Sequence, residues 1–110
     1  MRELLERLAE QARAHPKTIV FPEGHEPRVQ EAVKILVREG LVRPIVLGNP
    51  VELAFLGVPV INPAASPKLA RFAAEYQQLR AHKGITEAEA AATVVRPMYF
   101  GTMMLHAGLV

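Results

Sequence analysis

The chain has 110 residues, half of them apolar and 22% charged, a composition typical of a folded globular protein and not of a disordered one. Thirteen basic and eleven acidic residues leave a net charge of +2 and are scattered without a basic block, which argues against a nucleic-acid-binding protein. The absence of cysteine excludes disulfides, thiolate metal ligands and a covalent cysteine intermediate within these residues.

The N-terminal segment predicts a charged amphipathic helix that ends at Pro16. Its apolar stripe consists of Leu4, Leu5, Leu8 and Ala12. Acidic and basic side chains are mixed along this segment, which is not the pattern of a signal or transit peptide. No apolar run approaches the roughly 20 residues needed to span a bilayer. We therefore expect a cytoplasmic protein with no membrane partner.

Residues 18–39 predict a buried strand followed by a helix. The run TIVF (18–21) is continuously β-branched and aromatic, as in a strand buried on both faces. After the loop PEGHE, Pro27 suits the first position of a helix, and Gly40 suits its end. The helical spacing between them is carried by Val29, Ala32, Val33, Leu36 and Val37.

Short strands and helices continue to alternate as far as residue 79. Strands are predicted at 44–47 and 58–61, with one short helical turn between them at 51–56. Ser66 and Pro67 predict the N-cap and first position of another helix, whose apolar positions are Leu69, Phe72, Ala73, Tyr76 and Leu79. This order predicts the α/β class, with a parallel sheet flanked by helices and right-handed crossovers.

The stretch QQLRAHKGITEAE (77–89) allows two interpretations. The structural one assigns a helix end and the capped start of the next helix to Lys83, Gly84, Thr86 and Glu89. It leaves Arg80 and His82 unexplained. In the functional interpretation, these basic side chains lie at the mouth of a cleft and bind an anion. The spacing by itself favours the structural interpretation.

The last segment, RPMYFGTMMLHAGLV (96–110), is apolar almost all round. A helix of this kind predicts burial on every side, with Met98, Met103 and Met104 filling the core. Three strands and a few helices cannot easily supply that burial. Leu109 and Val110 also stand where another strand could begin, so we expect these residues to belong to a larger domain.

The residues present do not predict a complete active site. Ser66 is the single serine and is assigned to a helix cap, so no serine triad can be assembled. The histidines are His15, His25, His82 and His106, without HxH or HExxH spacing, and no metal is predicted. His25, between Glu23 and Glu26, could ligate a metal, tune a proton transfer or be a solvated turn residue.

The loop PEGHEP follows the first strand, where a dinucleotide-binding fold holds its phosphate cradle. The loop has one glycine where that fold has three, and its two carboxylates would repel an anion approaching the helix N-terminus. An NAD or ATP cofactor is therefore not expected there.

Several segments resemble, in order along nearly the whole chain, the N-terminal portion of the phosphate acetyltransferase (phosphotransacetylase) family. They are KTIVFPEG (17–24), PIVLGNP (44–50), YQQLRAHKGIT (76–86) and YFGTMMLHAG (99–108). The element LR-HKG-T followed by YFGTMM is the most specific piece. The resemblance implies part of an isocitrate/isopropylmalate dehydrogenase-like fold, in which two α/β domains enclose a cleft. The connection VELAFLGVPVIN (51–62) is shorter than is usual in the family.

The family implies acetyl transfer between acetyl phosphate and coenzyme A (CoA) by direct attack of the CoA thiolate, with no cofactor beyond CoA as a substrate. Residues 1–110 would be the N-terminal part of the domain, before the family's catalytic motifs. No catalytic residue is therefore assigned in this segment, and we expect the chain alone to be inactive. The resemblance implies a CoA or phosphate contact for Arg80, with Lys83 and His82 as further candidates, and a homo-oligomer or a need for the C-terminal part.

Three other functions stay open at this point. The chain could belong to a phosphate butyryltransferase, which shares the fold. It could be a non-catalytic acyl-CoA-binding or regulatory module, like the transferase-like tails of malic enzymes. It could also be a structural piece that assembles with a second polypeptide.

Overall fold

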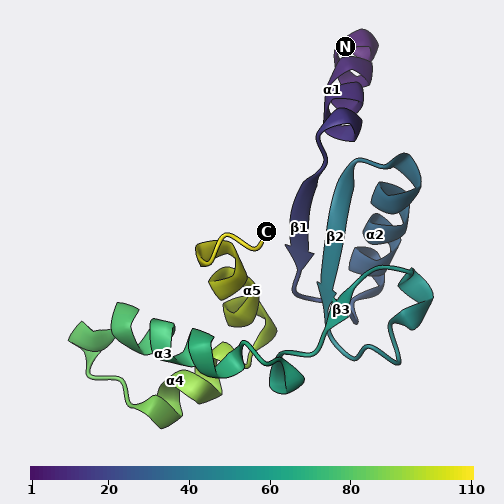
Figure 1. The fold of residues 1–110 in the computed structure, drawn as a ribbon. Helices are drawn as coiled ribbons and strands as arrows, with labels where there is room; N and C mark the ends of the chain where they lie inside the picture. The colour runs from purple at the N-terminus through teal and green to yellow at the C-terminus, as the bar shows by residue number, and fades with distance from the viewer.

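A computed structural model describes all 110 residues and contains a three-stranded parallel sheet in the order β1-β2-β3 (Figure 1). The strands are β1 (Lys17–Phe21), β2 (Val42–Leu47) and β3 (Val60–Ile61). The α-helices are α1 (Arg2–Ala14), α2 (Pro27–Glu39), α3 (Leu69–Leu79), α4 (Glu87–Val94) and α5 (Pro97–His106). Short 3-10 turns are η1 (Ala54–Leu56), η2 (Pro63–Ala65) and η3 (Ala81–Lys83). The predicted α/β class with parallel strands is confirmed.

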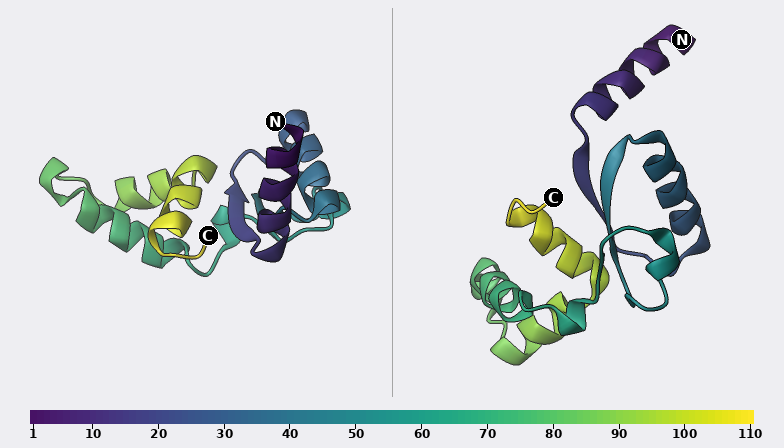
Figure 2. Two further views of the ribbon diagram at one scale, coloured as in Figure 1. Left: turned by 90° about the horizontal axis from the view of Figure 1, so that it is seen from above. Right: turned by 45° about the vertical axis from the view of Figure 1, so that its right-hand side comes forward.

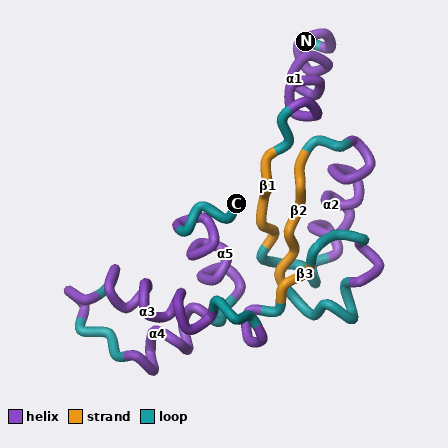
Figure 3. Tube along the Cα trace, in the orientation of Figure 1, coloured by secondary structure: helices purple, strands orange, loops and turns teal.

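The central strand, β2, separates two hydrophobic cores. Successive side chains of a strand point to opposite faces of the sheet. Val46 accordingly packs in a core with Val33, Leu53 and Leu56. Its neighbour Leu47 packs in a second core with Phe72, Val94, Phe100, Met103 and Met104. In Figure 3 the strands and α2 lie on one side of the molecule, and α3, α4 and α5 lie on the other.

Local signals set the ends of α2 and α3. The Glu26 carboxylate accepts a backbone N–H of the first turn of α2 at 3.3 Å, and Gly40 ends that helix with a left-handed φ of 66°. Helix α3 begins at Leu69, two residues later than predicted. The reason is that the Ser66 hydroxyl accepts the Lys68 N–H at 3.1 Å and forms a turn before the helix.

Helix α1 projects from the rest of the molecule, as the right-hand view of Figure 2 shows. None of its residues is buried, and Leu4, Leu5 and Leu8 are each at least 50% exposed. It is attached through Arg13, which donates to the backbone oxygen of Glu39 at 2.7 Å and to its carboxylate at 3.1 Å. None of the helices combines the length and apolar character needed to cross a membrane.

The expectation that the last helix is buried on every side is wrong for one of its faces. Phe100, Met103 and Met104 of α5 are buried, whereas Met98 is 58% and Leu105 64% exposed. The exposed side faces the free edge of the sheet, where no strand lies beyond β1. Burial of this face would need an element that these residues do not supply.

The molecule is more open than a compact domain of its length. Its radius of gyration is 16.3 Å and its extents are 52 × 30 × 20 Å. A compact chain of this size has a radius of gyration of about 13 Å. The projecting helix and the separation of the two cores account for the difference.

The Phe72 ring is fully buried and meets the Phe100 ring edge to face at 5.1 Å, which joins α3 to α5. We expect Phe72→Ala to lower the free energy of unfolding by about 3–5 kcal/mol, because it leaves a cavity. The matched control is Leu79→Ala on the same helix, which is 50% exposed and should cost less than about 1 kcal/mol. Denaturant titration measures both values, and equal losses would contradict the assignment of the core.

Candidate functional site

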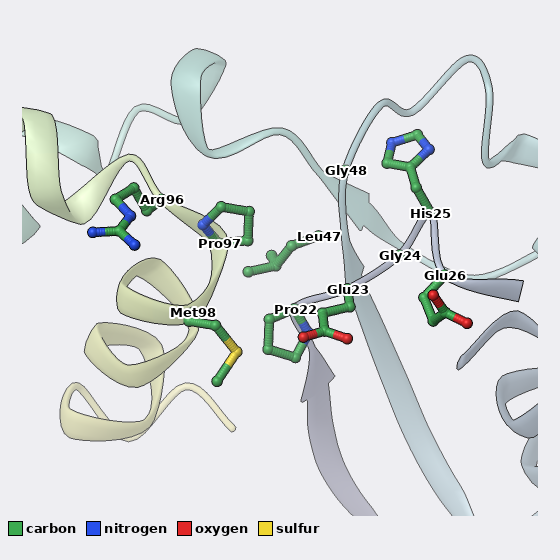
Figure 4. A pocket seen from close by; sticks show the side chains of 10 residues that line it. All are labelled: Pro22, Glu23, Gly24, His25, Glu26, Leu47, Gly48, Arg96, Pro97 and Met98. Carbon is green, nitrogen blue, oxygen red and sulfur yellow. The ribbon is translucent and has the colours of Figure 1, made fainter. Parts of the chain in front are cut away.

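A pocket of about 560 Å³ lies at the carboxyl ends of β1 and β2 (Figure 4). It lies between the loop that follows β1 and the start of α5. Its lining consists of Pro22, Glu23, Gly24, His25, Glu26, Leu47, Gly48, Arg96, Pro97 and Met98. Ligands of parallel α/β sheets generally bind outside the carboxyl ends of the strands. We therefore take this pocket as the candidate site.

Gly24 brings the loop after β1 into direct contact with β2. Its N–H donates to the backbone oxygen of Leu47 at 3.2 Å. A Cβ atom at this position would lie 2.4 Å from that same oxygen and 2.5 Å from a methyl group of Val46. Only glycine allows this approach, and it fixes the floor of the pocket.

His25 links the loop after β1 to the loop after β2. Its Nε2 accepts the N–H of Asn49 at 3.2 Å, and its Nδ1 lies 3.5 Å from the Glu52 carboxylate. The side chain is half-exposed, and no group of three or more potential ligands is placed to hold a metal ion. Among the roles predicted for His25, the contacts favour that of a turn residue, with the added function of connecting two loops.

The charges that line the pocket are segregated. Figure 4 shows Glu23, His25 and Glu26 on the side of the sheet and Arg96 on the side of α5, its guanidinium turned away from Glu23. Arg96 forms no ion pair with either carboxylate. Its guanidinium lies over the ring of Tyr99, 5.1 Å from the centroid. The pocket therefore offers an anion-binding group on one lip and proton acceptors on the other.

The turn that carries the sequence-predicted binding residues has the predicted structural features. Gly84 adopts a left-handed φ of 68°, and the Thr86 hydroxyl accepts the Glu89 N–H at 3.1 Å at the start of α4. The turn lies at the end of α3 that is remote from the sheet (Figure 1). The predicted cap at Thr86 is thereby confirmed, whereas the predicted helix end is displaced, because α3 ends at Leu79 and Gly84 closes the separate 3-10 turn η3.

Arg80, His82 and Lys83 are all exposed at this turn, and none of them lines the candidate pocket. The Arg80 guanidinium lies over the ring of Tyr76, 6.0 Å from its centroid. Nothing in these contacts tests whether the three residues bind substrate, so that role stays a prediction.

Sequence reasoning missed Arg96. A signal was present, because Arg96 directly precedes Pro97, the first residue of α5. A cation is unfavourable at a helix N-terminus, where the dipole is positive. An arginine at an N-cap position is therefore a reason to look for a binding role.

The comparison with known proteins covers nearly the whole chain. Residues 3–110 match the family described as phosphate acetyl/butaryl transferase. The chain belongs to this transferase family. The resemblance found in its sequence motifs is confirmed.

Curated phosphate acetyltransferases of two organisms illustrate the relationship. The one from Synechocystis sp. is 40% identical over 115 residues, covering 94% of this chain and 16% of the relative. The one from Thermoanaerobacterium thermosaccharolyticum is 35% identical over 112 residues, covering 96% of this chain and 34% of the relative. An NADP-dependent malic enzyme of Escherichia coli is 32% identical over 111 residues, covering 89% of this chain and 15% of that enzyme.

A solved structure of a phosphotransacetylase from Streptococcus pyogenes has the same fold. It superposes with a TM-score of 0.88 at 30% identity and covers all of this chain and 36% of the solved one. The phosphotransacetylase fold is thereby shown. The chain spans about a third or less of the length of each of these transferase relatives.

Gly24→Ala tests the loop contact that shapes the candidate pocket. The added methyl group would overlap a backbone oxygen, and we expect a loss of about 1–3 kcal/mol in the free energy of unfolding. Gly101→Ala in α5 is the control, because its added Cβ would meet its nearest neighbour, a methyl group of Val20, at 3.5 Å, an ordinary van der Waals contact. That change should be neutral or stabilising by up to about 1 kcal/mol. Thermal unfolding compares the two, and a neutral Gly24→Ala would contradict the proposed constraint.

Proposed function

We propose that the chain forms one wall of the active-site cleft in an enzyme that transfers an acetyl group between acetyl phosphate and CoA. The observation that carries this proposal is the family match over residues 3–110. Because the chain spans only part of its relatives, the activity is proposed for the larger protein, in the cytoplasm. Residues 1–110 would then be the N-terminal part of the transferase domain.

The reaction proposed is a direct displacement. The CoA thiolate attacks the carbonyl carbon of acetyl phosphate, a C–S bond forms, and the C–O bond breaks as phosphate leaves with the electron pair. A base must take the thiol proton, and cations must stabilise the charge on the phosphoryl oxygens. No acyl-enzyme and no cofactor are needed. The base is assigned to the part of the transferase outside these residues.

The exposed apolar surfaces support this division of the active site. The stripe on α1, the outer face of α5 and Ile19 on the free edge of the sheet are all open to solvent. Covering such surfaces is worth roughly 25 cal/mol for each Å² removed from water. We propose that the remaining part of the transferase covers them. A homo-oligomer stays a prediction from the family.

The proposed activity is tested by mixing acetyl phosphate and CoA with the complete polypeptide that contains this chain, and separately with the 110 residues alone. The absorbance of the thioester is followed. We expect the complete polypeptide to form acetyl-CoA and the isolated chain to form none. An inactive complete polypeptide would contradict the proposed function, and turnover by the chain alone would contradict the placement of the base elsewhere.

The similarity to a malic enzyme of Escherichia coli favours a second candidate, a module that binds an acyl-CoA without turning it over. Calorimetry with acetyl-CoA on the complete polypeptide separates the two. Binding without transfer supports the module, and binding with transfer supports the enzyme. Comparing acetyl phosphate with butyryl phosphate in the same assay decides between the two transferases.

Arg80 is the residue whose substrate contact the family implies. In the complete polypeptide we expect Arg80→Ala to raise the KM for CoA by about tenfold or more, since a charge-assisted contact to phosphate is lost. The control is Arg71→Ala on α3, the helix that precedes Arg80; the Arg71 guanidinium pairs with Glu75 at 3.0 Å. Steady-state kinetics and thermal unfolding are measured for both variants. An unchanged KM for CoA in the Arg80→Ala variant would contradict the predicted substrate contact and leave Arg80 with a structural role alone.

A further inference from the structure

His25, Asn49 and Glu52 close a ring of interactions between the loop after β1 and the loop after β2. The backbone N–H of Asn49 donates to His25 Nε2 at 3.2 Å, and the side-chain oxygen of Asn49 accepts the backbone N–H of Glu52 at 3.2 Å. The Glu52 carboxylate completes the ring, because it lies 3.5 Å from His25 Nδ1. We call these three residues the loop latch.

The loop latch lies against the wall of the pocket. His25 and Gly48 both line the pocket, and a Cβ atom at Gly48 would lie 3.0 Å from His25 Nε2. The backbone oxygen of Asn49 accepts the N–H of Leu53 at 3.0 Å, and the Leu53 side chain is buried in the core formed with α2. The Asn49 side of the latch is therefore fixed by the core, whereas the imidazole is half-exposed and open to protons from solvent.

The direction of the hydrogen bond from Asn49 fixes the protonation state of the imidazole. A backbone N–H donates, so Nε2 must accept with its lone pair, and the ring proton then lies on Nδ1, toward the Glu52 carboxylate. An imidazolium carries a proton on both nitrogens and would set its Nε2–H against the Asn49 N–H. The loop latch is therefore closed only when the His25 ring is neutral.

We propose that His25 is a positioning residue for acetyl transfer, which holds the pocket wall in place as a neutral imidazole and releases it when Nε2 takes up a proton. The proposal rests on the proposed transferase function, because that reaction is assigned to this pocket. His25 acts here through Asn49 and the adjacent Gly48, and no contact with substrate is assigned to it. Histidine changes charge between about pH 5 and 8, so we expect the release to fall in that range.

The charges around the imidazole determine which contact protonation breaks. The charged side chains that line the pocket or contact the ring are Glu23, Glu26, Glu52 and Arg96. Of the carboxylates, Glu52 alone lies within 4.0 Å of the ring, and the Arg96 guanidinium lies across the pocket (Figure 4). Protonation therefore keeps the contact with Glu52 as an ion pair and breaks the hydrogen bond with Asn49, which leaves the loop after β2 free to separate from the loop after β1.

The loop latch is tested by NMR on the 110-residue chain labelled with nitrogen-15. We expect a scalar coupling between the Asn49 backbone nitrogen and His25 Nε2, across their hydrogen bond, at about pH 8 and its loss at about pH 5. The ring proton should lie on Nδ1 at the higher pH. A ring proton on Nε2 instead, or an Asn49 amide signal that does not move while His25 is protonated, would overturn the proposal.

Two substitutions of His25 separate positioning from packing in the complete polypeptide. His25→Phe keeps an aromatic ring without an acceptor, and it should lower kcat/KM for acetyl transfer by about three- to tenfold at about pH 8 and leave it near the parent value at about pH 5. His25→Gln places an amide oxygen that accepts the same N–H and does not titrate. It should retain the parent kcat/KM at about pH 8 and exceed it by about threefold at about pH 5.

The matched control is His15→Phe, at an exposed histidine that ends α1. It should leave kcat/KM within twofold of the parent value at both pH values. A purely structural role of His25 would lower kcat/KM of His25→Phe by the same factor at both pH values, and that result would overturn the proposal. Thermal unfolding of each variant is measured alongside.

These measurements distinguish failure of the loop latch from failure of the proposed function. Acetyl transfer with a loss in His25→Phe that does not depend on pH would overturn the positioning role and leave the function. A latch that opens on protonation, in a complete polypeptide that transfers no acetyl group, would overturn the function and leave the latch as a pH-dependent contact between two loops.

Discussion

The contact between Gly24 and β2 is the constraint on which the arrangement of the site depends. The backbone oxygen that receives the Gly24 N–H belongs to Leu47, whose side chain is fixed in the core formed with α3, α4 and α5. The adjacent Val46 is fixed in the core formed with α2. A single point on β2 therefore anchors the loop after β1 to both halves of the molecule, and the pocket takes its shape from this point.

The same arrangement explains why the molecule is open. Two small cores on opposite faces of one strand bury few side chains, and the helices between and around them leave apolar surface exposed. A radius of gyration of 16.3 Å, against about 13 Å for a compact chain, expresses this quantitatively. Such a surface is unfavourable for an isolated domain, but it suits one wall of a cleft whose other wall is supplied by further polypeptide. The exposed apolar surface therefore accounts for the open shape of the molecule and also suits the proposed role as one wall of a cleft.

Short-range features of the fold could be predicted from the sequence because they depend on neighbouring residues. Gly84 closes its 3-10 turn and Thr86 caps α4 through their own backbone and side-chain chemistry, as their residue types predict, although α3 itself already ends at Leu79. Burial of α5 could not be predicted in this way, because it depends on what lies opposite Met98 and Leu105. The loop-to-loop contact of His25 likewise depends on how closely the ends of β1 and β2 approach each other. The candidate site was therefore only partly visible in the sequence.

The position of Arg80 shows how tertiary contacts can change the meaning of a local motif. Considered by itself, the turn after α3 is explained by helix capping, and it lies away from the pocket. The packing of Tyr76 against Tyr99 nevertheless connects Arg80 to Arg96 at the pocket mouth. A cation at the end of α3 is favoured by the helix dipole, whereas one at the start of α5 opposes it. Arg96 therefore carries an electrostatic cost that a bound anion would offset, whereas Arg80 carries none.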